Sequence, residues 1–394
     1  MQIKIRFFIM LTLLMAMSCY IVESYGPSLP AITRSFHTSM SLASNSVSVY
    51  FIGFGLAPLL YAPFSDTHGR RPVVIFGIWL ALASSIFAVS AQSITMLLIA
   101  RFLQGLGMGV VPGVVRCMAS DLSEGGRNLG RLMHKSAILF NLMPALAPII
   151  GGYIQYRLGW RFNLGSVVIL TLITLALTHL LLPETLTTKN NCSTLRAALA
   201  DYKQLLCLPK FLILPCFSLA TFSGVLCYLT YSPYFYQTVL HLNALENGLI
   251  GIVTTAAVIG GHYMNARLLK RSSLMSLLIV SGFYQFVAGL IMLLLSEYVP
   301  HHIITLAIPF FVFIIGDTGI RTNAFSHSMG ISHITRSSIS AIYSLIQFSG
   351  TGLLLALLLH IHLRNPFTLA IIFCCVGGFT FFVSMITQRG KHTS

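Results

Sequence analysis

The chain has 394 residues, of which 56% are hydrophobic and only 8% are charged, and its mean hydropathy is +0.83. A soluble protein usually carries about a quarter of its residues as Asp, Glu, Lys and Arg. Nine acidic residues cannot keep a globular surface of this size in contact with water, so the composition excludes a soluble protein and indicates a membrane protein. The eight cysteines include no CxxC pair, so they support neither a disulfide framework nor a structural zinc site.

Long apolar runs recur along the whole chain. Each has about 18 residues or more, enough to cross a bilayer as a helix. The runs are continuous rather than alternating, and lipid tolerates only helices or closed barrels, so they predict an all-α polytopic membrane protein. The first run ends at residues 25–30 without a small-residue cleavage site, so we expect a retained helix rather than a signal peptide. The twelve expected transmembrane helices are 7–27, 43–63, 73–92, 95–119, 133–155, 161–183, 209–231, 244–266, 273–296, 303–326, 337–360 and 366–387.

The basic residues indicate an orientation. A net charge of +15 would suggest nucleic-acid binding in a soluble protein. With the N-terminus in the cytoplasm, however, seventeen Lys and Arg residues fall on the cytoplasmic side of the expected spans. The four on the opposite side are Arg34, Arg157, Arg161 and Arg364. The positive-inside rule therefore predicts that both termini are cytoplasmic and that the basic surplus contacts membrane lipids, with no nucleic acid as partner.

The longest polar stretch divides the twelve spans into two sets of six. The sequence therefore predicts an N-terminal six-helix bundle over 1–183, a cytoplasmic linker over 184–208 and a C-terminal six-helix bundle over 209–394. Four linker side chains recur at a spacing typical of an amphipathic helix on the membrane surface, and a flexible linker is the other interpretation. These four are Leu195, Leu199, Tyr202 and Leu206. We expect the protein to be a monomer.

A short turn between the second and third spans carries a motif. Residues 62–74 read APFSDTHGRRPVV. This segment resembles the signature loop of the major facilitator superfamily, which typically reads GPLSDRFGRRPV, and it departs from that pattern at Ala62 and Thr67. The resemblance implies a major facilitator fold and a gating loop that latches the cytoplasmic side. The residues that match the gating loop are Asp66, Gly69, Arg70 and Arg71.

The expected topology gives Asp66 a partner. The eleventh span begins near Ser337 on the same side of the membrane, and the positive end of its helix dipole would attract the carboxylate. The competing interpretation is that Arg70 and Arg71 only enforce the topology.

Two arginines stand within expected spans, where a charge is costly unless it is paired or hydrated. Arg101 begins the segment RFLQGLGMG, residues 101–109. This segment resembles the RxxQG motif of the superfamily, whose arginine is associated with proton coupling. Arg116, further along the same span, matches a membrane arginine of drug-efflux relatives. Snorkelling to the membrane surface is the competing interpretation for both side chains.

Glu23 is the one carboxylate of the first span. Together with the following SYGPSLPAI it resembles the DMYLPALPAI stretch of the Bcr/CflA drug-resistance subfamily, in which an Asp occupies the matching position. A partly desolvated carboxyl group can take up and release a proton, as a proton-driven carrier needs. The resemblance implies that Glu23, Arg101 and Arg116 serve proton coupling, whereas an interfacial Glu at a helix end is the alternative for Glu23.

The fifth span contains APIIGG at residues 147–152. It resembles the antiporter motif GPxxGG, with Ala in place of the first Gly, and that motif accompanies efflux rather than uptake in the family. The matching residues are Pro148, Gly151 and Gly152. Close packing of a bent helix explains the same residues without a transport role. The sixth span closes with PETL at 183–186, which is often found there in this superfamily.

Two segments of the second half resemble the same subfamily. Residues 228–251 look like its seventh-to-eighth helix junction, and residues 261–271 look like its NARL-containing loop. The halves of such transporters are repeats around a central site. Three polar side chains are expected to line the substrate cavity: Tyr228, Tyr231 and Gln347. Tyr234 and Tyr236 are candidates for the same cavity, and the favoured interpretation for these two is an interfacial aromatic belt.

Asp317 and Arg321 stand one helical turn apart in the tenth span, where they can form an ion pair. The pair is interpreted either as a local salt bridge or as a substrate determinant. His301 and His302 are adjacent, their side chains diverge and further ligands are lacking, so no metal site is predicted.

The chain has no GxxxxGK[ST] phosphate loop, so ATP is not the expected energy source, and no nucleophile–base constellation suggests an enzyme or a cofactor. The resemblance implies a proton-coupled secondary transporter of the bacterial inner membrane that exports drugs or other small molecules by alternating access. The alternative function is transport of one dedicated metabolite, such as an amino acid, a sugar or a siderophore. A transport-dead receptor is disfavoured because the coupling and gating motifs are largely retained.

Overall fold

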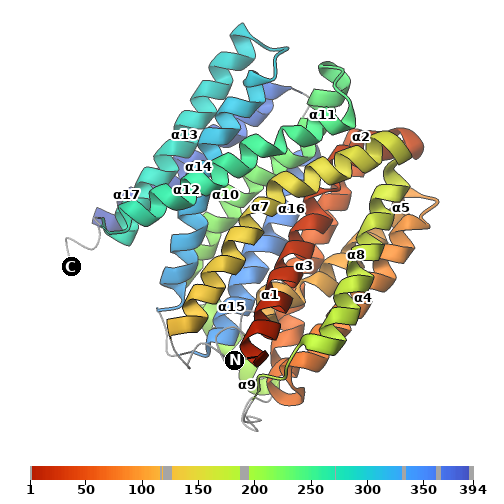
Figure 1. The fold of residues 1–394 in the computed structure, drawn as a ribbon. Helices are drawn as coiled ribbons and strands as arrows, with labels where there is room; N and C mark the ends of the chain where they lie inside the picture. Colours follow the sequence, from red (N-terminus) through yellow and green to blue (C-terminus); the bar gives the residue numbers. More distant parts are fainter. Residues whose placement is uncertain are drawn as a thin grey trace.

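The computed structural model describes residues 2–115, 118, 127–186, 195–270, 272–330, 334–360 and 365–389, so the predicted coupling residue Arg116 lies outside the described residues. Within these ranges every regular element is a helix (Figure 1). The expected all-α class is therefore confirmed.

The helices follow the expected order along the chain. Those before the linker are α1 (Gln2–Glu23), α2 (Leu29–Ser35), α3 (Met40–His68), α4 (Arg70–Val89), α5 (Ile94–Met108), α7 (Arg127–Leu158) and α8 (Trp160–Leu181). The later ones are α9 (Leu195–Leu206), α10 (Pro209–Tyr234), α11 (Ala244–Leu249), α12 (Gly251–Leu268), α13 (Leu274–Tyr298), α14 (Ile304–Ser328), α15 (Arg336–Ser344), α16 (Gly350–His360) and α17 (Pro366–Arg389). A 3₁₀ turn, η1 (Gly26–Ser28), and three π-helical turns, η2 (Val111–Val115), η3 (Phe235–Val239) and η4 (Leu345–Ser349), complete the described elements.

Eleven helical segments of the described chain are long and apolar enough to cross a membrane. They coincide with all the expected spans except the fifth. That span, 133–155, falls within α7, whose side chains are described from residue 142 onwards. The polytopic architecture predicted from the apolar runs is therefore present in the structure.

Side-chain caps begin four of these helices. Ser39, Ser93 and Ser273 each accept a hydrogen bond of 3.2 Å from the backbone N–H three residues further on. Asn243 and Glu246 form a reciprocal capping box at the start of α11. Such caps satisfy N–H groups that a helix start leaves without partners, so these helices begin at polar residues that flank the apolar runs.

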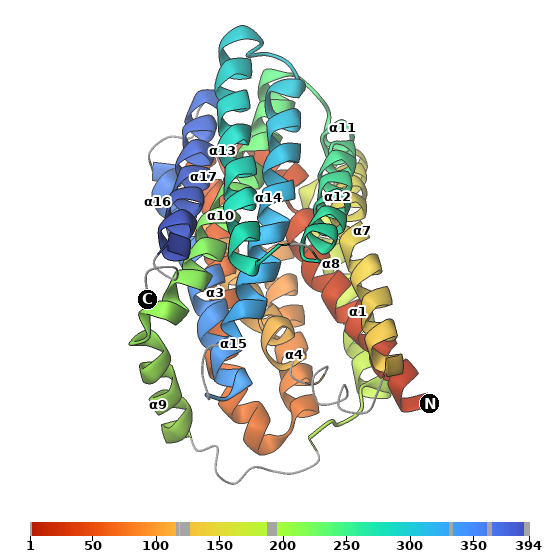
Figure 2. The same cartoon turned by 90° about the vertical axis from the view of Figure 1, so that its left-hand side faces the viewer.

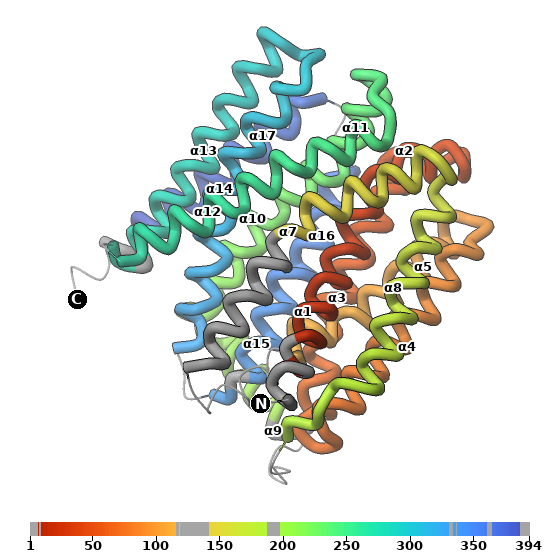
Figure 3. The backbone as a smooth tube through the Cα atoms, in the orientation of Figure 1, coloured from red at the N-terminus to blue at the C-terminus, as the bar shows by residue number. Residues whose placement is uncertain are grey.

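The helices that precede the linker and those that follow it occupy different sides of the molecule in Figure 1, with α7 between them. In the view of Figure 3, α4 packs on α5 and α8 at one flank, and α13 packs on α14 and α17 at the other. The boundaries of two separate bundles, 1–183 and 209–394, stay a prediction.

Two ends of the molecule are used below as references. The α9 end carries α9 and the start of α1, and the α11 end, opposite to it, carries α11 and η1 (Figures 1 and 2). α9 itself forms a helix, as the apolar spacing of the linker predicted. Its Tyr202 and Leu205 are buried, whereas Leu199 and Leu206 are exposed. One face of α9 therefore packs against the protein, and its other face carries exposed apolar side chains.

Candidate functional site

A cavity of about 290 Å³ lies between the N-terminal half of the chain, residues 2–186, and the C-terminal half, residues 195–389. Its walls come from α1, α3, η2 and α7 on one side and from α10, α12, α14 and η4 on the other. Two of the three π-helical turns contribute to it, and such turns often mark functional sites. Its size and its mainly apolar walls are those of a small-molecule site. It is called the central cavity below.

Aromatic rings from both halves meet in one wall of the central cavity. Phe51 of α3 packs edge-on against Phe222 of α10 at 5.3 Å between ring centroids. Phe54 of α3 packs in the same way against Phe348 of η4 at 4.9 Å. Phe222 and Phe348 are themselves 5.7 Å apart. These four rings form an aromatic cluster that is shared by the two halves.

The central cavity is lined by one carboxyl group, one imidazole and one guanidinium: Glu23, His262 and Arg321. Glu23 also lines a second, smaller cavity of about 40 Å³ that lies toward the α11 end and includes Tyr228, Tyr236 and Asn247. Glu23 therefore borders both spaces.

Arg321 is held by two neighbours. Its Nε donates to Asp317 Oδ2 at 2.8 Å, and its Nη2 lies 2.7 Å from the same oxygen. Its guanidinium carbon lies 5.0 Å from the centroid of Phe222 in the aromatic cluster. The Asp317 side chain is fully buried, whereas 33% of the Arg321 side chain is exposed. The ion pair predicted from the helical spacing is therefore present, and its arginine faces the central cavity.

Arg101 is buried, at 1% exposure, and does not snorkel to the surface. Its guanidinium lies over the rings of Tyr25 and Tyr50, at 4.3 and 4.5 Å from their centroids. Its Nη1 donates to Gln104 Oε1 at 2.5 Å, and Gln104 in turn donates to Ser85 Oγ at 2.7 Å. Two aromatic faces and an amide thus stabilise the buried cation.

Arg101 does not itself line the central cavity. Tyr50, one of its two aromatic neighbours, does. Its other neighbour, Tyr25, follows Glu23 by two residues. Tyr50 therefore connects Arg101 to the cavity wall, and the described residues include no direct ion pair between Arg101 and Glu23.

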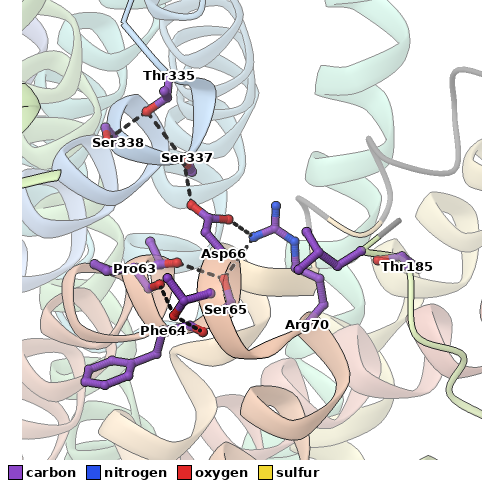
Figure 4. Close-up of polar contacts among 12 residues, drawn as sticks. Pro63, Phe64, Ser65, Asp66, Arg70, Thr185, Thr335, Ser337 and Ser338 are labelled. Carbon is purple, nitrogen blue, oxygen red and sulfur yellow. Dashed lines mark hydrogen bonds and ion pairs between the residues drawn. The ribbon is translucent and has the colours of Figure 1, made fainter. Parts of the chain in front are cut away.

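The predicted gating loop adopts a defined geometry at the α9 end (Figure 4). Arg70 Nη1 lies 2.5 Å from Asp66 Oδ1 and donates to Ser65 Oγ at 2.8 Å. Ser337 Oγ, at the start of α15, donates to the second Asp66 oxygen at 3.5 Å. Asp66 of α3 therefore lies between Arg70 of α4 and the first turn of α15, where the helix dipole favours a negative charge.

Glu184, from the PETL segment, is a residue whose role the sequence interpretation missed. Its carboxylate accepts hydrogen bonds of 3.1 Å from the backbone N–H groups of both Arg70 and Arg71, in the first turn of α4. Burial opposes its ionisation, yet these bonds and two more from Thr185 and Leu186 hold the pKa of Glu184 below its usual range. The end of the sixth span is thereby tied to the gating loop.

Gly69 is the residue around which this loop turns. Its φ of +110° is one that side chains with a Cβ rarely adopt. A Cβ at this position would also lie 2.7 Å from Glu184 Oε2. Arg71, the neighbouring gating residue, donates from Nη2 to His179 O at 2.7 Å. Backbone conformation and the nearby carboxylate therefore both require glycine at position 69.

A second acidic residue also contacts the start of α15. Asp201 of α9 accepts hydrogen bonds of 3.0 Å from Thr335 Oγ1 and from Ser338 Oγ. Tyr202, the next residue of α9, donates to Leu59 O of α3 at 3.4 Å. The linker helix therefore contacts elements of both halves beside the gating loop.

The halves meet closely at the α11 end, around the predicted antiporter motif. A Cβ at Gly151 would lie 2.3 Å from Ser24 O, and a Cβ at Gly152 would lie 2.3 Å from Ala244 O. The first contact joins α7 to the end of α1, and the second joins it to α11. Pro148 of the same motif lines the smaller cavity next to Glu23.

Hydrogen bonds between the two halves of the chain add to the contacts at the α11 end. Thr33 and Tyr234 share a bond of 2.7 Å between their hydroxyls, and Gln237 donates to Pro27 O at 2.9 Å. The interpretation of Tyr234 and Tyr236 as an interfacial belt is wrong, because both are buried, at 6% and 1% exposure. Both side chains lie in the contact region between the halves instead.

Three expected cavity residues do not line the central cavity. Tyr228 stacks on Phe310 with 3.4 Å between centroids and shares a 3.1 Å bond with Tyr236, so it borders only the smaller cavity. Tyr231 packs against Phe235, 6.1 Å away. Gln347 is buried within η4, whose Phe348 faces the central cavity. The π-helical turn changes the angular position of its side chains, which a regular helical spacing does not anticipate.

The fold and the cavity define a class: a polytopic helical membrane protein with a ligand-sized site between the two halves of its chain, as in secondary transporters. The family model of the Major Facilitator Superfamily matches residues 8–353. The chain belongs to this superfamily.

Its relatives include drug-resistance proteins. Multidrug resistance protein D of Escherichia coli strain K12 is 26% identical over 360 residues, which cover 90% of this chain and 89% of the relative. The bicyclomycin resistance protein homolog of Haemophilus influenzae is 25% identical over 298 residues, 74% of each chain. The predicted resemblance to the Bcr/CflA type is therefore confirmed.

Two further comparisons concern length and fold. An uncharacterized transporter of Rickettsia felis is 27% identical over 248 residues, and the match spans 63% of this chain but 60% of that relative. A solved structure of the Escherichia coli xylose transporter XylE, in a partially occluded inward open conformation, has a TM-score of 0.74 at 14% identity and covers 97% of both chains. That likeness shows the fold alone.

Proposed function

We propose that this protein exports drugs or other amphipathic small molecules across the inner membrane of a bacterium in exchange for protons. The observation that carries the proposal is the position of Glu23, a carboxyl group on the wall of the central cavity that also borders the smaller cavity toward the α11 end. An ionisable group within a membrane span marks a substrate or proton pathway. A proton and a cationic part of a substrate would compete for this carboxylate, and such competition couples two opposite fluxes.

The cycle is alternating access, in which the halves rock around the central cavity. Opening the α11 end would separate Gly152 from α11 and Tyr234 from Thr33. Opening the α9 end would separate Asp66 from Ser337. The two sets of contacts lie at opposite ends of the cavity, so each can close while the other opens. This arrangement supports a gating role for Asp66, Gly69, Arg70 and Arg71.

The charge distribution supports an orientation. Lys and Arg concentrate on the side of the expected spans that includes the α9 end, and the positive-inside rule assigns that side to the cytoplasm. The proposed protein therefore has cytoplasmic termini and contacts anionic lipids there, and it acts as a monomer because one chain encloses the cavity. In the proposed orientation, the α11 end faces outward.

The test is the accumulation of ethidium and a small drug panel in efflux-deficient bacterial cells that express this chain. We expect lowered accumulation, reversal by a proton uncoupler, and loss of export in Glu23→Gln. Glu297→Gln is the matched control, because Glu297 is an exposed carboxylate of α13. Export by Glu23→Gln at the rate of the control would remove Glu23 from the mechanism.

A second candidate function is the transport of one dedicated metabolite. It is favoured by the polar groups of the central cavity, since Arg321 and His262 can fix a ligand in one orientation. Unchanged accumulation of every drug in the panel, with the protein present in the membrane, would contradict broad efflux and favour this candidate.

A further inference from the structure

The central cavity carries opposite charges on opposite halves of the chain. Glu23 comes from α1 in the N-terminal half, and Arg321 comes from α14 in the C-terminal half. In the part of the chain that the structure describes, the two groups form no ion pair within 4.0 Å, although both line the same space. Room therefore remains between a negative and a positive pole.

Arg321 keeps donor capacity toward this space. A guanidinium has five N–H donors in a fixed plane. Asp317 engages Nε and Nη2, and Phe222 covers one face of the plane. Among the described residues, Nη1 has no hydrogen-bond partner, and a third of the side chain is exposed. A carboxylate or similar acceptor can therefore bind at this edge of the guanidinium.

The charged groups of the cavity select the kind of ligand. Asp317 neutralises Arg321, so the pair adds no net charge, and with a neutral His262 an ionised Glu23 leaves the site with one negative charge. A molecule with only an acidic group would face this net negative charge. A molecule with only an amine would satisfy Glu23 and leave Nη1 of Arg321 without an acceptor. A molecule that carries both groups pairs its amine with Glu23 and its acid with Nη1 of Arg321, so neither of these groups stays without a partner.

Most of the other residues that line the central cavity are apolar. The aromatic cluster of Phe51, Phe54, Phe222 and Phe348 is among them, and its rings offer faces and edges to a flat ligand. The ligand that fits this arrangement therefore has an apolar, preferably aromatic, body between its two charged groups.

We propose that the central cavity binds a zwitterionic amphipathic molecule, with its amine on Glu23, its aromatic body against the phenylalanine cluster and its carboxylate on Arg321. This assignment rests on the proposed transport function and names its substrate class. It also agrees with the proposed coupling, because the amine and the proton compete for the same carboxylate. Arg321 then determines specificity through the acid that it binds, and Asp317 is a positioning residue that fixes its guanidinium.

The test is equilibrium binding to the purified full chain in lipid nanodiscs with three matched probes. These are 4′-(aminomethyl)biphenyl-4-carboxylate, 4-(aminomethyl)biphenyl and biphenyl-4-carboxylate, which share one body and carry both charges, the amine only or the acid only. We expect the zwitterion to bind about tenfold or more tightly than either single-charge probe, as the loss of a charge-assisted hydrogen bond predicts. Equal affinities for the zwitterion and the amine-only probe would overturn the proposal.

Variants of the charged residues test which of them cause the preference for the zwitterion. Arg321→Gln alone would leave Asp317 buried without a counter-charge, so the neutral pair Asp317→Asn with Arg321→Gln is used. We expect this double variant to bind the zwitterion no more tightly than the amine-only probe. Glu23→Gln should bind it no more tightly than the acid-only probe. Arg267→Gln, which removes an arginine that packs on Tyr263 outside the cavity, should keep the preference. A preference retained in the double variant would overturn the role of Arg321.

Failure of this inference differs from failure of the proposed function. Ethidium export that survives in the double variant, together with no zwitterion preference in the wild type, would refute the inference and leave proton-coupled export standing. The expected binding pattern without uncoupler-sensitive export would support the ligand class and refute the proposed export.

Discussion

Glu184 lies at the N-terminus of α4 and accepts hydrogen bonds from the backbone N–H groups of Arg70 and Arg71, each 3.1 Å long. A carboxylate at this position compensates the positive end of the helix dipole and satisfies donors that the first turn leaves unpaired. It comes from the end of the sixth span, more than a hundred residues away in sequence, so one side chain joins two spans beside the gating loop.

The first prediction concerns the pH dependence of this contact. Glu184→Gln should lower the free energy of unfolding by about 1 kcal/mol at neutral pH, as the loss of a helix cap does. The pKa of Glu184 is lower in the folded protein than its ordinary value of 4.5. The contribution of the Glu184 charge to the free energy of unfolding is therefore complete above pH 4.5, and it is lost as the pH falls through the pKa of Glu184 in the folded protein. Thermal unfolding of both proteins across the acidic range measures this difference.

The control for this experiment is Glu297→Gln, which alters an exposed carboxylate elsewhere. The difference between wild type and Glu184→Gln should shrink in acid, whereas the control should match the wild type throughout. A difference that stays constant into strong acid would show that the charge of Glu184 contributes nothing.

The second prediction concerns Gly69. Gly69→Ala should destabilise the loop by about 1 kcal/mol or more, because a Cβ is strained at φ of +110° and meets Glu184. The double variant Gly69→Ala with Glu184→Ala should remove the contact with the carboxylate but not the backbone strain. A double variant that is as stable as Glu184→Ala alone would contradict the contribution of backbone strain. Thermal unfolding and drug export measure both effects.

The third prediction concerns Gly152. Gly152→Ala should separate α7 from α11, because a Cβ would lie 2.3 Å from Ala244 O and the backbone cannot yield there. We expect faster hydrogen exchange over residues 237–250 and reduced export with the protein still inserted. Gly165→Ala in α8 is the control, because a Cβ at that position meets nothing within 4 Å. Unchanged exchange in Gly152→Ala would refute a role in closing the α11 end.

The fourth prediction concerns the linker helix. Asp201→Asn should weaken the two bonds to Thr335 and Ser338, at a cost of about 0.5–1.5 kcal/mol for each hydrogen bond that is lost. Hydrogen exchange of α9 should accelerate, and export should change because the start of α15 also carries the contact to Asp66. Lys203→Gln changes the charge of the same helix without these bonds and serves as control. Equal exchange in both variants would contradict the proposed docking of α9.

Much of the fold follows from the sequence because a bilayer imposes a simple rule. Every run of apolar residues long enough to cross it must be helical, so eleven of the twelve spans could be located, with their ends displaced by up to eight residues. Glu23 could be singled out for the same reason, since a carboxylate in such a run has a cost that function must justify. The ion pair of Asp317 and Arg321 followed from helical spacing alone.

The walls of the site could not be predicted in this way. Phe51, Phe54, Phe222 and Phe348 are four of 27 phenylalanines, and the sequence does not indicate which of them face inward. The π-helical turn η4 brings Phe348 rather than Gln347 to the central cavity. Glu184 reaches the gating loop only because distant spans pack side by side. Each of these features depends on tertiary contacts that no local pattern encodes.

The aromatic cluster has a consequence for proton leakage through the carrier without substrate. Phe51 with Phe222, and Phe54 with Phe348, each join one half to the other. In the proposed cycle, opening the cavity separates such pairs, each worth about 0.5–1.5 kcal/mol. A flat ligand replaces the lost ring contacts with its own, whereas an empty carrier loses them outright. In the proposed cycle, the phenylalanine contacts therefore slow the conformational change of the carrier without substrate, and bound substrate removes this barrier. A carrier that seldom changes conformation without substrate dissipates little of the proton gradient.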